Sequence, residues 1–123
     1  MAGLLRFTVL GCGSSPGVPR ITGDWGNCDP GNPRNRRTRT AAMVERVAED
    51  GGITRVVIDT GPDFRAQMLA ANVGHIDAVV YTHWHADHIH GIDDLRGYWL
   101  EQRKLIDLHA DVPTLSRLKQ AFA

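Results

Sequence analysis

The most constraining feature of this 123-residue sequence is an apolar run that leads directly into four potential metal ligands. Residues 76–81, Ile-Asp-Ala-Val-Val-Tyr, predict a buried strand. His83, His85, Asp87 and His88 follow it in the pattern H-x-H-x-D-H. Alternate residues of an extended segment point to one side, so the two histidines can share one ion and the next two ligands a second. A polar turn that is rich in histidine by chance is the alternative. The preceding strand argues against it, because ligands at the end of a rigid strand are held in place.

Three further segments accompany this motif: residues 10–19 (LGCGSSPGVP), 58–63 (IDTGPD) and 91–95 (GIDDL). Together with residues 83–88 and 57–61, they make the sequence similar to the metallo-β-lactamase-fold hydrolases. Within that family it most resembles the branch of the phosphoribosyl cyclic phosphate phosphodiesterases. The resemblance runs over nearly the whole chain. It implies an α/β fold, the N-terminal half of a four-layer α/β/β/α sandwich, with a mixed sheet and helices on one face.

The length of the chain fits one modest domain, and we treat residues 1–123 as a single unit. The resemblance implies that a complete fold of this family needs about twice that length. It also implies that the second half supplies a further His, a bridging Asp and another His. His109, the only histidine downstream of the motif loop, lies in a predicted strand and does not correspond to them. We therefore expect a half-fold that is either truncated or able to assemble.

The composition excludes some classes of function. Apolar residues make up 42% and charged residues 23%, and the formal net charge is zero. No overall charge therefore attracts nucleic acid or a membrane surface. The first residues lack the basic region and apolar core of a signal peptide, and Cys12 and Cys28 alone make no disulfide framework. The sequence predicts a cytoplasmic protein.

Hydrophobic periodicity predicts five strands and three helices. The strands are expected at residues 4–10, 40–48, 53–59, 76–81 and 105–109. The helices are expected at about residues 62–72, 93–102 and 111–122. A loop rich in Gly, Pro and Ser runs from the first strand to about residue 38, and loops of this length are usually functional or mobile.

The resemblance also implies roles for the motif residues. His83 and His85 would bind the first of two divalent metal ions, and the predicted catalytic pair Asp87 and His88 would bind the second. Imidazole and carboxylate ligands suit Zn²⁺ and Mn²⁺, and paired metals make hydroxide available at neutral pH. Asp59 ends a predicted buried strand and is expected to orient a ligand imidazole. The alternative is that Asp59 caps the helix that follows.

Two features suggest a phosphate-ester substrate. The backbone N–H groups of Gly13, Ser14 and Ser15 could cradle a phosphate, although a tight turn that needs glycine explains this loop equally well. Arg36 and Arg37 belong to a basic cluster, and arginine binds phosphate bidentately. A solvated loop is the alternative for these arginines.

The remaining candidates have ordinary structural explanations. We expect Asp63 in the first turn of a helix, where it favours the helix dipole. Asp93 and Asp94 are expected to begin the next helix, and His75 to be structural. His90 either lines the metal pocket or lies on the surface.

Two functional hypotheses follow. In the first, the parent protein is a metal-dependent hydrolase, a phosphodiesterase that cleaves a cyclic phosphate or a small nucleotide-like ester through a metal-bound hydroxide. In the second, the chain is a catalytically incomplete half-fold. It would bind metal weakly and assemble with itself or with a missing C-terminal half, because an uncovered apolar sheet face drives association. Neither hypothesis includes a membrane or a nucleic acid as partner.

Overall fold

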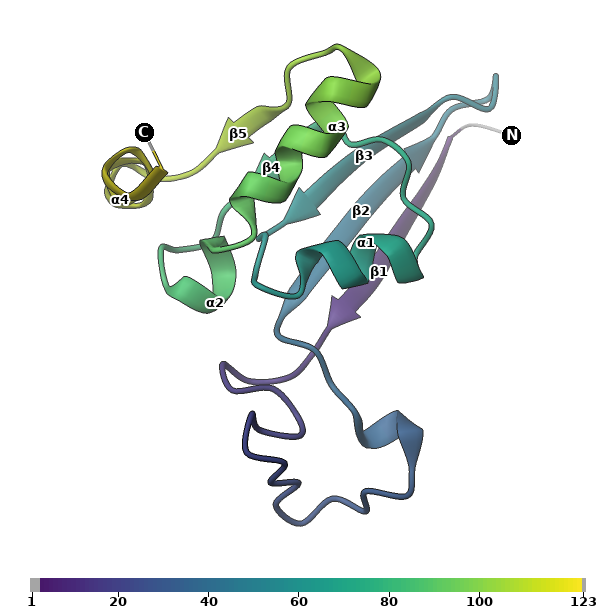
Figure 1. Cartoon of the computed structure of the whole chain (residues 1–123). Coiled ribbons are helices and arrows are strands. Elements are labelled where there is room, and N and C mark those ends of the chain that lie inside the picture. Colours follow the sequence, from purple (N-terminus) through teal and green to yellow (C-terminus); the bar gives the residue numbers. More distant parts are fainter. Residues whose placement is uncertain (1–2, 123) are drawn as a thin grey trace.

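The computed structural model of the chain describes residues 3–122, and its centre is a five-stranded sheet in the order β1-β2-β3-β4-β5 (Figure 1). The strands are β1 (Leu4–Gly11), β2 (Ala41–Val47), β3 (Ile53–Ile58), β4 (Ala78–Val80) and β5 (Asp107–His109). The helices are α1 (Phe64–Ala70), α2 (Ala86–Ile89), α3 (Leu95–Gln102) and α4 (Val112–Phe122), with the short 3-10 helices η1 (Pro33–Asn35) and η2 (Ile92–Asp94). This is the α/β class that the sequence predicts.

The sheet is mixed, and its connections bring the ends of four strands together. β1 pairs with β2 and β2 with β3 in antiparallel fashion, whereas β3, β4 and β5 are parallel. The chain turns between β2 and β3 at Gly51, whose φ of 88° suits glycine. β1, β3, β4 and β5 therefore run in the same direction. Their C-terminal ends meet at one end of the sheet, which is where ligand sites of open α/β sheets form.

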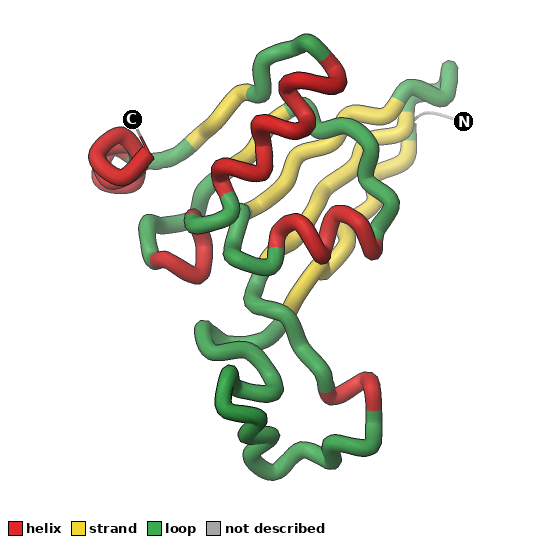
Figure 2. Tube along the Cα trace, in the orientation of Figure 1, coloured by secondary structure: helices red, strands yellow, loops and turns green. Residues whose placement is uncertain are grey.

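Helices α1 and α3 cover one face of the sheet (Figure 2). α1 buries Phe64 and Met68, which are four residues apart and lie on the same side of the helix. They pack in one core with side chains from the strands and the other helices, among them Met43, Val57, Ile76, Val79, Leu95 and Leu118. Within residues 3–122, none of the helices combines the length and the apolar character needed to cross a membrane.

The opposite face of the sheet is uncovered. In β1, Leu5, Phe7 and Val9 are 70%, 63% and 61% exposed. The strand register places Phe7 beside Val44 and Val44 beside Val56. An apolar row therefore crosses three strands without a covering layer, and such a patch favours association.

The predicted strands and helices are present, with two differences near the motif. β4 has only three residues instead of residues 76–81. Before its N-terminal end, the backbone N–H and carbonyl of Ile76 bond to the side-chain amide of Gln102 rather than to a neighbouring strand. The second half of the motif, predicted as part of a loop, forms the short helix α2. A helix of four residues is too short to show a hydrophobic period.

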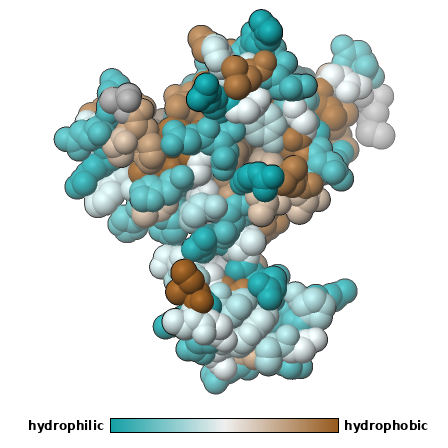
Figure 3. All heavy atoms as spheres, viewed as in Figure 1, coloured by the Kyte–Doolittle hydropathy of each residue, from teal (hydrophilic) through white to brown (hydrophobic). Residues whose placement is uncertain are grey.

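Residues 12–40 form a loop lobe that extends from the same end of the sheet as α2 (Figure 1). Isolated bridges join Gly13 to Arg39 and Val18 to Arg37, so the two sides of the lobe are held together. The lobe surface on the side shown in Figure 3 is largely hydrophilic. The lobe therefore adds a polar wall beside the end of the sheet that carries the motif.

Candidate metal centre

The four motif side chains gather at the C-terminal end of β4. His83 and His85 lie on the extended segment after β4, and Asp87 and His88 lie on α2. The ring centroids of His83 and His85 are 4.6 Å apart, and those of His83 and His88 are 4.0 Å apart. Nε2 of His88 is 3.2 Å from a carboxylate oxygen of Asp87. The turn from strand to helix thus brings three imidazoles and one carboxylate together.

Asp59 supplies the buried carboxylate that orients these side chains. It follows β3 and is 2% exposed. Its Oδ1 accepts a hydrogen bond from the Thr82 N–H (2.8 Å), and its Oδ2 accepts from the Thr82 hydroxyl (2.7 Å) and from His88 Nδ1 (2.6 Å). A carboxylate only accepts, so Nδ1 of His88 carries a proton, and in the neutral ring the lone pair is on Nε2, beside Asp87. The Asp59 carboxylate therefore accepts hydrogen bonds from Thr82 and His88. The alternative prediction, that Asp59 caps the helix that follows, is wrong, because the N-cap of α1 is Asp63.

Thr82 extends this arrangement to His83, a role that the ligand pattern alone did not indicate. Its hydroxyl donates its one proton to Asp59 and can then only accept from His83 Nδ1, which is 2.9 Å away. His83 is therefore protonated at Nδ1, and in the neutral ring its lone pair, like that of His88, is on Nε2. A metal ion binds this form of imidazole, in which the other N–H is held by a neighbour. The Thr-His pair that begins the motif is the sequence signal for the relay.

Close backbone packing fixes the segment after β3 against the motif. The Thr60 N–H donates to the His88 carbonyl (2.9 Å), and the Gly91 N–H donates to the Thr60 carbonyl (2.8 Å). A β-carbon on Gly61 would collide with the backbone oxygen of Asp87, and one on Gly91 would collide with the backbone oxygen of Gly61. Glycine at both positions allows the two segments to touch.

A buried hydroxyl pair lies beside Asp59. The hydroxyls of Tyr81 and Thr60 are 2.7 Å apart. Burial raises the pKa of Tyr81 to about 12, and the charge of Asp59 adds to this rise, while the hydrogen bond with Thr60 opposes it. Tyr81 therefore stays protonated at neutral pH and forms a rigid wall next to the ligand loop.

The donor set fits a divalent ion, but only as part of a site. Neutral imidazoles and a carboxylate are ligands that Zn²⁺ and Mn²⁺ accept. Within residues 3–122, no three His, Cys, Asp or Glu side chains are arranged as a complete metal-binding group. This part of the chain offers two adjacent pairs, His83 with His85 and Asp87 with His88. Each pair needs further ligands to close a coordination shell.

Asp63 clamps the loop lobe to α1. Its carboxylate accepts hydrogen bonds from the Arg39 backbone N–H (2.8 Å), Nε (2.7 Å) and Nη2 (2.9 Å). These bonds hold the pKa of the Asp63 carboxyl below its ordinary value and raise the pKa of Arg39, to which the charge of Asp87 adds. Gln67 strengthens the clamp by donating to the Arg39 carbonyl. Asp63 was predicted in the first turn of this helix, but it is the N-cap residue before α1, and its side chain makes no capping hydrogen bond to the helix.

The predicted phosphate loop is mostly a tight turn. The Gly13 N–H donates to the Thr38 carbonyl (2.8 Å). Because this N–H already has an acceptor, the phosphate contact predicted for it is not supported. Ser14 and Ser15 are exposed, and the Ser14 carbonyl accepts from the Gly17 N–H.

Arg36 and Arg37 are the predicted phosphate contacts with the most open surroundings. Both line two pockets of the lobe, of about 370 and 430 Å³. The Arg36 guanidinium lies 5.4 Å from the ring centroid of Trp25.

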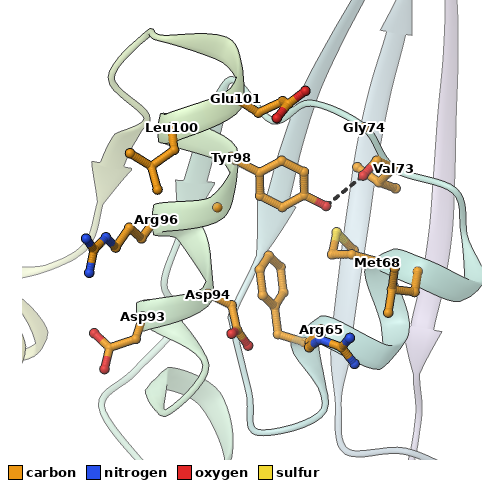
Figure 4. Close-up of a pocket in the computed structure, with 13 residues that line it drawn as sticks. Arg65, Met68, Val73, Gly74, Asp93, Asp94, Arg96, Tyr98, Leu100 and Glu101 are labelled. Carbon is orange, nitrogen blue, oxygen red and sulfur yellow. Dashed lines mark hydrogen bonds between the residues drawn. The ribbon is translucent and has the colours of Figure 1, made fainter.

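The remaining candidates lie away from the ligand cluster. His75 contacts Arg55 Nη1 (3.1 Å) and the Ile53 carbonyl (2.9 Å) at the opposite end of the sheet, which agrees with a structural role. Asp93 and Asp94 precede α3 and line a pocket of about 530 Å³ between α1 and α3 (Figure 4). In that pocket the Tyr98 hydroxyl donates to the Val73 carbonyl (2.7 Å). The motif histidines do not line it.

The family and the fold are shown by comparison with known proteins. Residues 54–123 match the family model described as the Beta-lactamase superfamily domain, and the chain belongs to this superfamily. A diphosphatase from the PhnP family has a crystal structure that is 41% identical in sequence, with a TM-score of 0.80 over 97% of this chain and 46% of that chain. The predicted family and fold class are therefore confirmed.

More distant structures share the fold alone. Zn²⁺-bound PqqB from Methylobacterium extorquens is 20% identical, with a TM-score of 0.59 over 89% of this chain and 50% of that chain. The metallo-β-lactamase fold protein YhfI from Bacillus subtilis is 16% identical, with a TM-score of 0.61 over 97% of this chain and 43% of that chain.

Two curated relatives match shorter stretches. An octanoyltransferase of Porphyromonas gingivalis is 41% identical over 92 residues, which is 75% of this chain and 18% of that protein. A beta-lactamase-like protein 2 homolog of Caenorhabditis elegans is 33% identical over 61 residues, which is 44% of this chain and 21% of that protein. The chain thus spans half or less of the length of each of these relatives and structures.

Proposed function

We propose that this chain provides part of the active site of a metal-dependent hydrolase, a phosphodiesterase that acts on a cyclic phosphate or a small nucleotide-like ester. The observation that carries the proposal is the hydrogen-bonded relay from Asp59 through Thr82 to His83, with His88 on the same carboxylate. In the neutral rings, it places the lone pairs of His83 and His88 on their Nε2 atoms. Membership of the superfamily and the 41% identity to a diphosphatase support hydrolysis of a phosphate compound.

The proposed metal ligands are the two pairs of the motif. His83 and His85 would hold one divalent ion, and Asp87 and His88 a second, with Zn²⁺ or Mn²⁺ as the ions. When bound, such a pair lowers the pKa of water and stabilises negative charge on phosphate oxygens. Asp59 favours the tautomer that binds metal, since it accepts a hydrogen bond from His88 and one from the Thr82 hydroxyl, which in turn accepts from His83.

The loop lobe supports a phosphate-bearing substrate. Residues 12–40 contain five arginines and two aspartates, without lysine or glutamate. Arg39 is already paired with Asp63. Arg36 and Arg37 are exposed, so their guanidinium groups can bind phosphate oxygens in the bidentate manner typical of arginine. Ser14 and Ser15 are the neighbouring hydroxyl donors of the proposed phosphate contact.

Metal titration tests the proposed site. Zn²⁺ and Mn²⁺ are titrated into the parent chain and into a variant with His83→Ala and His85→Ala together. We expect the double variant to lose tight metal uptake, because both ligands of one ion are gone. His75→Ala is the control, since His75 lies at the other end of the sheet, and its metal uptake per folded molecule should match that of the parent. Equal metal content in the double variant and the parent would refute the site.

The uncovered sheet face favours a second candidate function. Here the chain is a half-fold that binds metal weakly and assembles with itself or with a C-terminal half. The exposed Leu5, Phe7 and Val9 of β1 are the observation behind this candidate. Leaving a few hundred Å² of apolar surface in water costs several kcal/mol at ~25 cal/mol/Å², which is comparable to the stability of a whole domain.

Light scattering combined with a cyclic-phosphodiester assay separates the two candidates. For an assembling half-fold, we expect a mass above that of one chain, with and without Zn²⁺, and no turnover by the monomer. A monomer with metal-dependent turnover would exclude the half-fold and support a complete hydrolase.

A further inference from the structure

Helix α4 contacts the motif segment, residues 82–90, at two places. The guanidinium carbon of Arg117 lies 4.2 Å from the ring centroid of Trp84, which stands between His83 and His85 in the sequence. The Phe122 ring meets the His90 ring edge-on, with centroids 5.9 Å apart. One helix therefore touches the loop both within the motif and just after it.

α4 is itself anchored, so it can act as a support. Thr114 and Leu118 are 1% and 6% exposed and lie one helical turn apart. Leu118 belongs to the same core as the sheet and α1. Arg117 is adjacent to this buried stripe and therefore projects from a part of the helix that is fixed.

His85 is the motif imidazole that this support reaches. His83 is held by Thr82, and His88 is held by Asp59. In the described part of the chain, no side-chain hydrogen bond or ion pair holds the His85 ring. Its ring contacts are with His83, at a centroid distance of 4.6 Å, and with Trp84, whose ring stands at 84° to it with centroids 5.1 Å apart. Trp84 is 38% exposed and lies outside the buried core, and the guanidinium of Arg117 lies over its ring.

We propose that α4 braces the ligand loop and that Arg117 is a positioning residue, which acts through Trp84 to hold the His85 imidazole beside that of His83. A metal-binding histidine usually donates a hydrogen bond from its other ring nitrogen, and the contact with α4 takes the place of that bond for His85. The part of the proposal that concerns metal affinity rests on the proposed function. The part that concerns the Trp84 ring does not.

The first experiment measures Co²⁺ binding by the absorption bands of the bound ion. A cation–π contact of this kind corresponds to an affinity change of about two- to fivefold. We expect Arg117→Ala to weaken Co²⁺ binding by that factor and Arg117→Lys to restore part of it. Lys119→Ala, an exposed charge on the same helix, is the matched control and should have no effect. In a Trp84→Ala background, Arg117→Ala should change nothing further, because it acts through that ring.

The second experiment needs no metal. Trp25→Phe and Trp99→Phe leave Trp84 as the only tryptophan, and the decay of fluorescence anisotropy then reports the mobility of its ring. We expect Arg117→Ala to increase the fast component of this decay, and Lys119→Ala to leave it unchanged. Unchanged ring mobility in Arg117→Ala would overturn the brace. Increased mobility in a chain that binds no Co²⁺ would support the brace and count against the proposed function alone.

Discussion

Replacing Asp59 by asparagine should remove the hydrogen bonds that orient His88 and Thr82 while keeping the shape of the side chain. The carboxylate accepts three hydrogen bonds of 2.6–2.8 Å in a site that is 2% exposed. An amide has one oxygen, which can keep the bond from the Thr82 N–H. Its NH₂ group then faces two donors, the Thr82 hydroxyl and His88 Nδ1.

The size of the effect follows from these contacts. Two hydrogen bonds to a charged group contribute about 1.5–3 kcal/mol each. The amide is easier to bury than a carboxylate and offsets part of the loss, so we expect the free energy of unfolding to fall by about 2–4 kcal/mol. To accept from the new NH₂ group, His88 must move its proton to Nε2, which removes the lone pair from the metal side. Loss of such a supporting group lowers metal affinity by about 10–100-fold.

The assay is competition for Zn²⁺ against a chromophoric chelator, with denaturant unfolding of the metal-free protein alongside. Asp93→Asn is the control, because Asp93 is an exposed carboxylate that lines the pocket between α1 and α3. Its Zn²⁺ affinity and stability should match those of the parent. If Asp59→Asn binds Zn²⁺ within about twofold of the parent, the assigned tautomers and the role of Asp59 are wrong.

Three further changes test other parts of the structure. Burial raises the pKa of Tyr81 to about 12 from an ordinary 10.0, so its contribution to stability is full below pH 10.0 and is lost as the pH rises towards 12. Denaturant unfolding at several alkaline pH values should show this fall, and a pH-independent free energy there would contradict it. Glu45→Leu removes the partner of Arg55, 2.8 Å away in a site where Glu45 is 4% exposed. It should lower the free energy of unfolding by about 3 kcal/mol, and a neutral result in the same measurement would disprove the role of this pair. Phe7→Lys on the uncovered sheet face should shift the chain towards monomer in light scattering, whereas Ile21→Lys, at a fully exposed position of the loop lobe, should not.

The fold was predictable to the extent that its signals are local. Alternation of apolar residues located β1, β2 and β3, and helical spacing located α1 and α4. The short β4 was predicted too long because its boundary depends on Gln102, a residue far along the chain that binds the Ile76 backbone. The loop lobe gave no periodic signal, since its shape depends on bridges and on the Arg39–Asp63 clamp.

The site was predictable where ligands are close in sequence and less so where support comes from elsewhere. The spacing of the histidines indicated the cluster directly. Asp59 was a candidate because a carboxylate at the end of a buried strand needs a partner. Its contact with Thr82 depends on the parallel register of β3 and β4, in which Ile58 lies beside Val80. The partner of Trp84, on the last helix, was not visible in any local pattern.

The supports of the ligands share a property that bears on how a complete site would form. Asp59 contacts His88, Thr82 contacts His83, and Arg117 contacts Trp84 beside His85, and all three supports lie within this chain. The orientation of the histidines is therefore fixed before any ligand from another segment arrives. Groups that are ordered in advance lose less conformational entropy on binding. In the proposed site, His83 and His88 already have the tautomer that suits a metal ion, so further ligands would add affinity without rearranging these two. This reasoning accounts for a well-ordered ligand loop next to a sheet face that has no cover.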